Sequence, residues 1–291
     1  MNNLTNQQKG SLMAFIAIMF ITPDSLLIRL SNIETWGMLF YRGAIPFFVV
    51  LFGLILFYKN NFFKALFKIG YPGIFYVISF SICNITFIIS IQNTNVANTL
   101  LMVALAPMLS AILGAIFLKE KPDSKTWFAI IITFIACVYI FYDSLSLGNF
   151  YGDLFGLITS FGLACNANIA RYAKSTDLVP AAVIGKSCVA IFAFFFVKDF
   201  SLVGNDIFYI PLMCVMCVAI PFVLVTIAPR FITAAEVNLF FLLETILGPL
   251  WVWMVIKEQP SNETIYGGAV IIITIAIHSI LAIKKTQTKS T

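Results

Sequence analysis

The chain has 291 residues, of which 60% are hydrophobic and 11% are charged, and its mean hydropathy is +0.97. Soluble domains carry about 25% charged residues, so this chain has too few charges to cover a water-facing surface and is expected to be an integral membrane protein. The formal net charge of +5 does not indicate a nucleic-acid partner, because the basic residues lie in short segments between apolar runs.

Ten apolar runs follow one another, each close to the roughly 20 residues that a membrane-spanning helix needs. Transmembrane strands would alternate apolar and polar residues, and these runs do not, so all ten are expected to be helices. The predicted fold is an all-α integral membrane protein with ten transmembrane helices and only short connections. The runs cover residues 10–30, 35–58, 70–91, 96–118, 125–142, 151–171, 180–197, 207–229, 234–256 and 263–283.

Basic residues between the runs are distributed unevenly, and this predicts the orientation. With the N-terminus in the cytoplasm, only Arg29, Lys198 and Lys257 lie on the outer side. Cytoplasmic loops carry the excess of Lys and Arg, so both termini are expected to be cytoplasmic, in a multi-pass protein of the cell inner membrane. The cytoplasmic basic residues are then Lys9, Lys59, Lys64, Lys68, Lys119, Lys121, Lys125, Arg171, Lys174, Arg230, Lys284, Lys285 and Lys289.

Two blocks of sequence recur at constant offsets, which indicates an internal repeat. The predicted repeats are residues 1–145 and 146–291, each with five helices. Because five is odd, the two halves enter the membrane with opposite orientation, and such inverted repeats are typical of secondary transporters. Gly10, Leu12, Ile16 and Arg29 match Gly152, Leu154, Ile158 and Arg171, while Ala97, Leu105, Leu109, Lys119, Glu120 and Pro122 match Ala235, Leu243, Leu247, Lys257, Glu258 and Pro260.

Two five-helix repeats in about 290 residues resemble the drug/metabolite transporter superfamily of the EamA type. The segments Leu118–Pro122 and Ile256–Pro260 are similar to the turn that ends the fourth helix of such repeats. Glu244 resembles the acid of a Leu-Glu-Pro motif in the ninth helix, with Thr245 in place of the proline. In the first helix of each repeat, the pairs Asp24 with Arg29 and Asn166 with Arg171 have the family's spacing. The resemblance implies a metabolite transporter, with export as its common role.

Glu244 lies in the middle of the run 234–256, near the expected midplane of the bilayer. A carboxylate there costs roughly 2.5–3.5 kcal/mol, so such residues usually face a partner, a cavity or a transport path. Its counterpart in the first repeat is Ala106. Glu244 can therefore bind a substrate ammonium or carry a proton, or it can be a structural carboxyl.

Arg42 and Lys186 occupy similar places in the second helix of each repeat. At 1.5 Å per residue, each lies roughly 10 Å deep, on opposite sides of the midplane. They are expected to flank a central cavity and to meet anionic groups of a substrate. The alternative is that both side chains extend to the lipid headgroups.

Three further residues complete the candidate substrate site. Asp24 lies beside Pro23, which can open the helix, and it can pair with Arg42, contact substrate or act as a gate. Asn166 occupies the position in the second repeat that matches Asp24, and it is expected to line the cavity. Tyr41 neighbours Arg42 and can line the path or anchor the helix at the interface.

The sequence contains few of the residues and motifs that enzyme active sites use. The single histidine, His278, lies in the last apolar run, and no phosphate-binding Gly-rich loop is present, so neither a cofactor nor ATP-driven pumping is expected. The six cysteines lie within apolar runs and are expected to be reduced packing residues. The predicted function is secondary active transport of small organic metabolites such as amino acids, by alternating access, with protons as a candidate coupling ion. A membrane-embedded enzyme acting on lipid or prenyl substrates and a passive channel are the alternatives.

Overall fold

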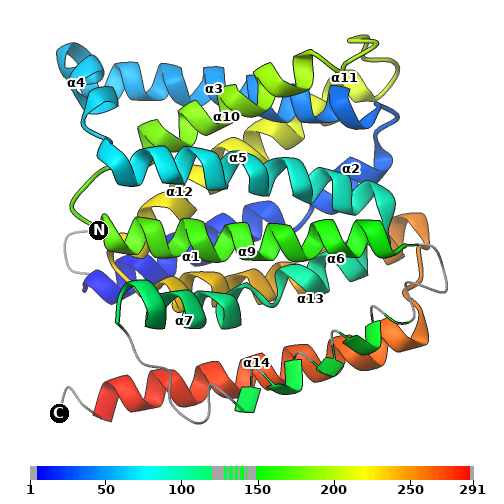
Figure 1. The fold of residues 1–291 in the computed structure, drawn as a ribbon. Coiled ribbons are helices and arrows are strands. Elements are labelled where there is room, and N and C mark those ends of the chain that lie inside the picture. Colours follow the sequence, from blue (N-terminus) through cyan, green and yellow to red (C-terminus); the bar gives the residue numbers. More distant parts are fainter. Residues whose placement is uncertain are drawn as a thin grey trace.

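The structure is a computed structural model that describes residues 5–119, 128–129, 131–133, 135–136, 138–140, 142 and 149–288. Every regular element in these residues is helical, and the long helices lie side by side along one direction (Figure 1). The predicted helix over 125–142 lies partly outside the described residues. Glu120, Lys121, Pro122 and Lys125 lie outside them entirely.

The first part of the chain contains α1 (Asn6–Ile21), α2 (Asp24–Leu30), α3 (Thr35–Tyr58), η1 (Lys59–Asn61), α4 (Phe62–Phe67), α5 (Gly70–Asn93), α6 (Val96–Val103) and α7 (Ala106–Phe117). The second part contains α9 (Phe150–Tyr172), α10 (Val179–Phe194), α11 (Asp206–Leu212), the π-helix η2 (Met213–Ala219), α12 (Ile220–Ile227), η3 (Ala228–Arg230), α13 (Ala234–Ile256) and α14 (Asn262–Thr288).

Six helical segments of the described chain are long and apolar enough to cross a membrane, which confirms an all-helical, multi-pass protein. The ten-helix count and the inverted repeat stay predictions. The six segments are Asn6–Leu30, Thr35–Tyr58, Gly70–Asn93, Val96–Phe117, Asp206–Arg230 and Glu236–Ile256.

Helix α9 is long enough to span but less apolar, because it packs in the middle of the bundle along α5, α6 and α7. All of its buried residues are Gly, Ala, Ser, Thr, Asn or Asp. Small and weakly polar residues let helix backbones approach closely inside a membrane bundle. The composition of α9 therefore reflects contact with protein.

Three of the spanning segments are interrupted near their middle. Between α1 and α2 the break falls at Thr22 and Pro23, and between α6 and α7 it falls at Ala104 and Leu105, two residues before Pro107. Proline lacks the N–H that would continue the helical hydrogen bonds. In the third segment, η2 inserts a π-helical stretch between α11 and α12. Such interruptions are tolerated at membrane depth where they are buried in protein or line a cavity.

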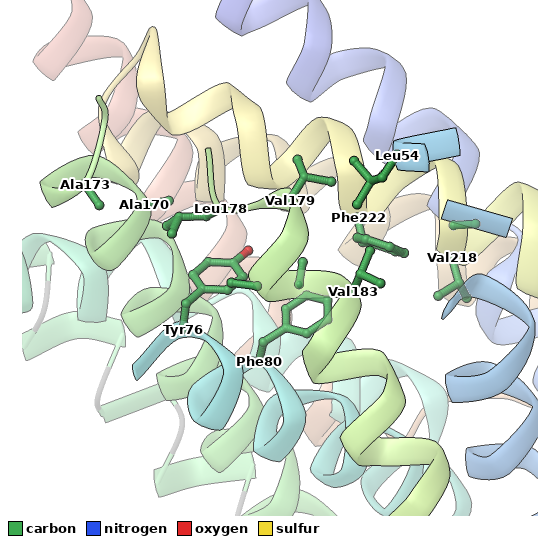
Figure 2. Close-up of a cluster of buried hydrophobic side chains, with 13 residues drawn as sticks. Leu54, Tyr76, Phe80, Ala170, Ala173, Leu178, Val179, Val183, Val218 and Phe222 are labelled. Carbon is green, nitrogen blue, oxygen red and sulfur yellow. The ribbon is translucent and has the colours of Figure 1, made fainter. Parts of the chain in front are cut away.

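A cluster of buried hydrophobic side chains packs α5, α10 and α12 against one another (Figure 2). Tyr76 and Phe80 from α5 meet Val179 and Val183 from α10, and Phe222 from α12 joins them. The Tyr76 hydroxyl forms a hydrogen bond with that of Thr226, at 2.9 Å, so its polar atom is satisfied inside the cluster. This packing fixes the helices that carry one side of the site.

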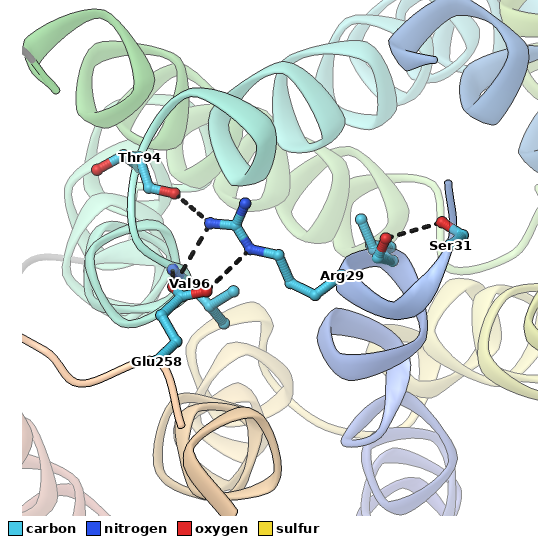
Figure 3. Close-up of polar contacts among 6 residues, drawn as sticks. Arg29, Ser31, Thr94, Val96 and Glu258 are labelled. Atoms are coloured by element: carbon cyan, nitrogen blue, oxygen red, sulfur yellow. Dashed lines mark hydrogen bonds and ion pairs between the residues drawn. The ribbon is translucent and has the colours of Figure 1, made fainter. Parts of the chain in front are cut away.

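The two ends of the bundle are held by polar contacts. At the end that carries α2, Arg29 forms an ion pair with Glu258 at 3.2 Å and donates a hydrogen bond to the Thr94 carbonyl at 2.6 Å (Figure 3). Glu258 also accepts a hydrogen bond from the Val96 N–H, at 2.9 Å, at the start of α6. One carboxylate therefore ties three segments together. At the opposite end, which carries α4, Arg171 donates to the Ile232 carbonyl at 3.4 Å.

Candidate functional site

A cavity of about 130 Å³ lies at the centre of the bundle. It is lined by α1, α2, α3, α5, α6, α9, α10, η2, α12 and α13, so residues from both halves of the chain contribute. Five of the six predicted site residues line it, namely Asp24, Arg42, Asn166, Lys186 and Glu244. The sixth, Tyr41, is not among the lining residues.

Asp24 and Arg42 form a closed ion pair in the wall of the cavity. The guanidinium donates two hydrogen bonds, Nη1 to Oδ1 at 2.6 Å and Nη2 to Oδ2 at 2.8 Å. The two residues are 2% and 7% exposed. Because Asp24 is the first residue of α2, the break at Pro23 places its carboxylate at the level of Arg42 in α3. The pairing is one of the arrangements that the sequence left open, and it neutralises both charges.

Lys186 is in a different environment, although it is equally buried at 1% exposure. Its ammonium donates one hydrogen bond to the Asn84 amide oxygen, at 2.5 Å. It also lies 5.4 Å from the centre of the Phe80 ring and 5.7 Å from that of Phe222, within the range of cation–π attraction. No carboxylate among the described residues forms an ion pair with it. Lys186 is thus a buried cation held by neutral groups.

Arg42 and Lys186 lie on α3 and α10, two helices that pack closely against each other. A Cβ at Gly43 would lie 2.6 Å from the Ala190 backbone nitrogen and 2.8 Å from the Lys186 carbonyl oxygen. A Cβ at Gly185 would lie 2.8 Å from the Phe80 ring. Glycines beside Arg42 and Lys186 therefore let α3, α10 and α5 approach one another closely.

Glu244 is 3% exposed and lines the same cavity from α13. Within the described part of the chain, its carboxylate has neither a hydrogen-bond partner nor an ion pair. It lies near enough to the Asp24–Arg42 pair to interact electrostatically with both residues. Burial of an unpaired charge is costly, so this carboxylate requires a proton or a ligand with hydrogen-bond donors.

Asn166 adds a second acceptor without a partner. It is 7% exposed, and its Oδ1 atom accepts no hydrogen bond from the described residues. Asn238 also lines the cavity, but its amide nitrogen is occupied by Ser110 Oγ at 3.1 Å. Buried polar atoms are normally hydrogen-bonded, so the free oxygen of Asn166 is suited to a ligand or to water.

Tyr41 lies outside the cavity. Its hydroxyl donates a hydrogen bond to the Phe200 carbonyl at 2.5 Å, and its ring packs edge-on against Phe40. This contact joins α3 to the segment that follows α10. A role for Tyr41 in the transport path stays a prediction.

The sequence did not single out the groups that hold Lys186. Asn84 was one of several amides within apolar runs, and Phe80 and Phe222 are two of 30 phenylalanines. Their contacts depend on which faces of α5 and α12 turn inward, and no local signal specifies this. No group of three or more metal-binding side chains comes together in the part of the chain that the structure describes.

Comparisons with known proteins place the first part of the chain beside one family. Residues 8–142 match the model of the EamA-like transporter family, which is part of the drug/metabolite transporter superfamily. No curated protein matches the sequence. One solved crystal structure, titled "Crystal structure of protein", has a TM-score of 0.70 and 14% sequence identity, covering 94% of this chain and 98% of its own. That likeness shows the fold alone.

The apolar helices show a multi-pass membrane protein, and the match over residues 8–142 supports a membrane transporter of the drug/metabolite transporter superfamily. The EamA-like family consists of transporters, and the absence of enzyme activity in this chain stays a prediction. Charged side chains from both halves of the chain line the central cavity.

Proposed function

We propose that this protein is a secondary active transporter that exports small organic metabolites such as amino acids across the cell inner membrane. Transport proceeds by alternating access around the central cavity, as residues 1–145 and 146–291 rock against each other. The observation that carries the proposal is a cavity lined by both halves, with Lys186 and Glu244 in its wall, neither of which forms an ion pair with a described residue.

Paired contacts support the inverted repeat on which this mechanism depends. Gly10 packs against Phe231 and Ile232, and its counterpart Gly152 packs against Asn93 and Thr94. Phe231 and Ile232 are the counterparts of Asn93 and Thr94, because the same spacing separates them as separates Ala235 from Ala97. Arg29 and Arg171 donate to the Thr94 and Ile232 carbonyls in the same way, and the matching residues Lys119 and Lys257 both have positive φ angles, 58° and 64°.

The proposed orientation places the α4 end, and with it both termini, in the cytoplasm. The start of α1 and the end of α14 lie at that same end of the bundle (Figure 1). Single cysteines at position 262, beyond α13, and position 64, within α4, test the orientation. A membrane-impermeant maleimide is expected to label position 262 and spare position 64 in intact cells. The reverse pattern would invert the topology.

Transport itself is tested with the purified full chain in liposomes. Vesicles loaded with unlabelled L-alanine should take up labelled L-alanine against its gradient, because a carrier exchanges substrate through one alternating site. A passive channel would only equilibrate the label. If no candidate metabolite is exchanged, the proposal fails.

Glu244 is proposed to receive either a substrate ammonium or a proton, and these two roles give different results. If it carries a proton, Glu244→Gln should abolish gradient-driven accumulation and retain exchange, because the amide resembles the protonated acid. If it binds an ammonium, both activities should fall together. The control is Glu263→Gln, which removes a carboxyl that does not line the cavity. Wild-type behaviour of Glu244→Gln in both assays would leave Glu244 a structural carboxyl.

A further inference from the structure

The charges in the cavity wall divide into a neutralised pair and two separate ions. Arg42 directs both terminal nitrogens at the Asp24 carboxylate. Lys186 and Glu244 are not joined by a salt bridge, although both line the cavity. One positive and one negative group therefore remain for a ligand, because Arg42, unlike Lys186, already has an acidic partner.

The surroundings of Lys186 are those of an anion-binding pole. An ammonium has three donors, and the only hydrogen bond that Lys186 makes to described residues is the one to Asn84. The rings of Phe80 and Phe222 lie against its charge without providing acceptors. A carboxylate can supply both the missing acceptors and the missing countercharge.

The surroundings of Glu244 favour the opposite kind of group. Its carboxylate and the free Oδ1 of Asn166 are both acceptors in the wall of one cavity. A primary ammonium offers three donors and a positive charge. An anionic ligand group at this place would meet like charge and find no donor from either residue.

The volume of the cavity is sufficient for a small ligand. An engineered cavity of about 150 Å³ holds one benzene molecule. The cavity here, at about 130 Å³, has room for a molecule of about six non-hydrogen atoms.

We propose that Lys186 and Glu244 are the charge-selecting residues of the cavity, and that they bind a small zwitterion with its acidic group against Lys186 and its ammonium against Glu244. Asn84 is a positioning residue that holds the lysine, and Asp24 with Arg42 forms a neutral wall. This inference rests on the proposed function, and it assigns the charges of the substrate and the residue that meets each of them.

Three probes of similar size test the inference by ligand-induced thermal stabilisation of the purified full chain. L-Alanine carries both charges, propionate lacks the ammonium and propylamine lacks the carboxylate. A ligand that binds only the folded state raises the unfolding temperature. L-Alanine is expected to bind wild-type protein about tenfold or more tightly than either single-charge probe, because hydrogen bonds to charged groups account for such differences.

The decisive readout is a reciprocal change of preference. Glu244→Gln leaves the lysine as the uncompensated charge, so the ratio of propionate to L-alanine affinity should rise about tenfold. Lys186→Gln should raise the ratio for propylamine in the same way. The controls Lys68→Gln and Glu263→Gln make the same charge changes away from the cavity and should keep the wild-type order.

A purely structural role would lower all affinities together without reversing any preference, and that result would overturn the inference. Equal stabilisation of wild-type protein by all three probes would do the same, as would no stabilisation by L-alanine. Failure of the proposed function looks different, because the charge preferences would persist in binding while liposomes showed no exchange of any probe.

Discussion

Arg42 and Lys186 show how differently one bundle can treat two buried cations. They lie on adjacent helices that pack through Gly43, and both line the same cavity. Arg42 is matched by two short hydrogen bonds to a carboxylate. Lys186 has one amide oxygen and two aromatic faces.

The difference separates structure from recognition. A fully paired ion has little to gain from a ligand, because a new partner must displace one that is already in place. A cation that faces only neutral groups gains a countercharge when an anion enters. Equal burial therefore does not imply an equal role. The partners of each ion decide whether it stabilises the structure or recognises a ligand.

The largest expected effect comes from breaking the closed pair. Arg42→Gln would leave the Asp24 carboxylate buried without a countercharge, and removal of one partner of a buried pair costs about 3–5 kcal/mol. The unfolding temperature of the purified protein in detergent should fall accordingly. The double variant Asp24→Asn with Arg42→Gln should recover most of the loss.

Lys186→Met is the matched comparison for Arg42→Gln. It leaves only the neutral Asn84 without its partner, so it should destabilise the fold less. If it costs as much as Arg42→Gln, the distinction between a paired and an unpaired cation is wrong.

Much of the fold could be predicted because the limits of a spanning helix are local. The runs 35–58 and 234–256 coincide with α3 (Thr35–Tyr58) and α13 (Ala234–Ile256), since each apolar run ends at a lysine, Lys59 or Lys257. The break before Asp24 was also visible, because Pro23 marks it. Pro211 and Pro221 flank the π-helical stretch η2, but a proline alone does not distinguish a π-helical insertion from a simple break.

The charged residues that line the site could be predicted from the sequence, but the way in which they pair could not. Charged residues inside apolar runs are conspicuous, and this brought Asp24, Arg42, Lys186 and Glu244 to attention. Which acid faces which base depends on how helices distant in sequence pack. Asn84 shows this limit, because an amide among apolar residues does not reveal which of its neighbouring helices it contacts.

A smaller effect is expected when the lysine loses its positioning residue. Asn84→Ala removes the acceptor of the Lys186 hydrogen bond, and hydrogen bonds to charged groups contribute about 1.5–3 kcal/mol. Both the unfolding temperature and the affinity for L-alanine should decrease. Asn93→Ala is the control on the same helix, because among the described residues the Asn93 side chain donates to the Ile89 carbonyl of its own helix. Unchanged L-alanine affinity in Asn84→Ala would contradict the positioning role.

The packing of α3 on α10 gives the next prediction. In Gly43→Ala the new methyl group would meet backbone atoms of Ala190 and Lys186 closer than 3 Å, so the helices must separate, and overpacking of this kind costs about 1–3 kcal/mol. Gly53→Ala is a matched control on the same helix, because a Cβ there meets no atom within 4 Å. Equal unfolding temperatures for the two variants would show that the close approach is not needed.

The smallest expected effect concerns a second ion pair, that of Arg29 and Glu258. Their side chains are 25% and 23% exposed, and exposed pairs contribute about 0.2–1 kcal/mol. Glu258→Gln removes the charge and keeps an oxygen that can accept the Val96 N–H. Its small deficit should shrink further at high salt, since solvent ions screen exposed charges. The deficit of Arg42→Gln should persist, because a buried pair is screened much less.

Glu258→Ala also removes the cap of α6, so it should cost about 0.5–2 kcal/mol more. A Glu258→Gln deficit as large as that of Arg42→Gln would show that pairing alone, and not burial, sets the strength of these contacts.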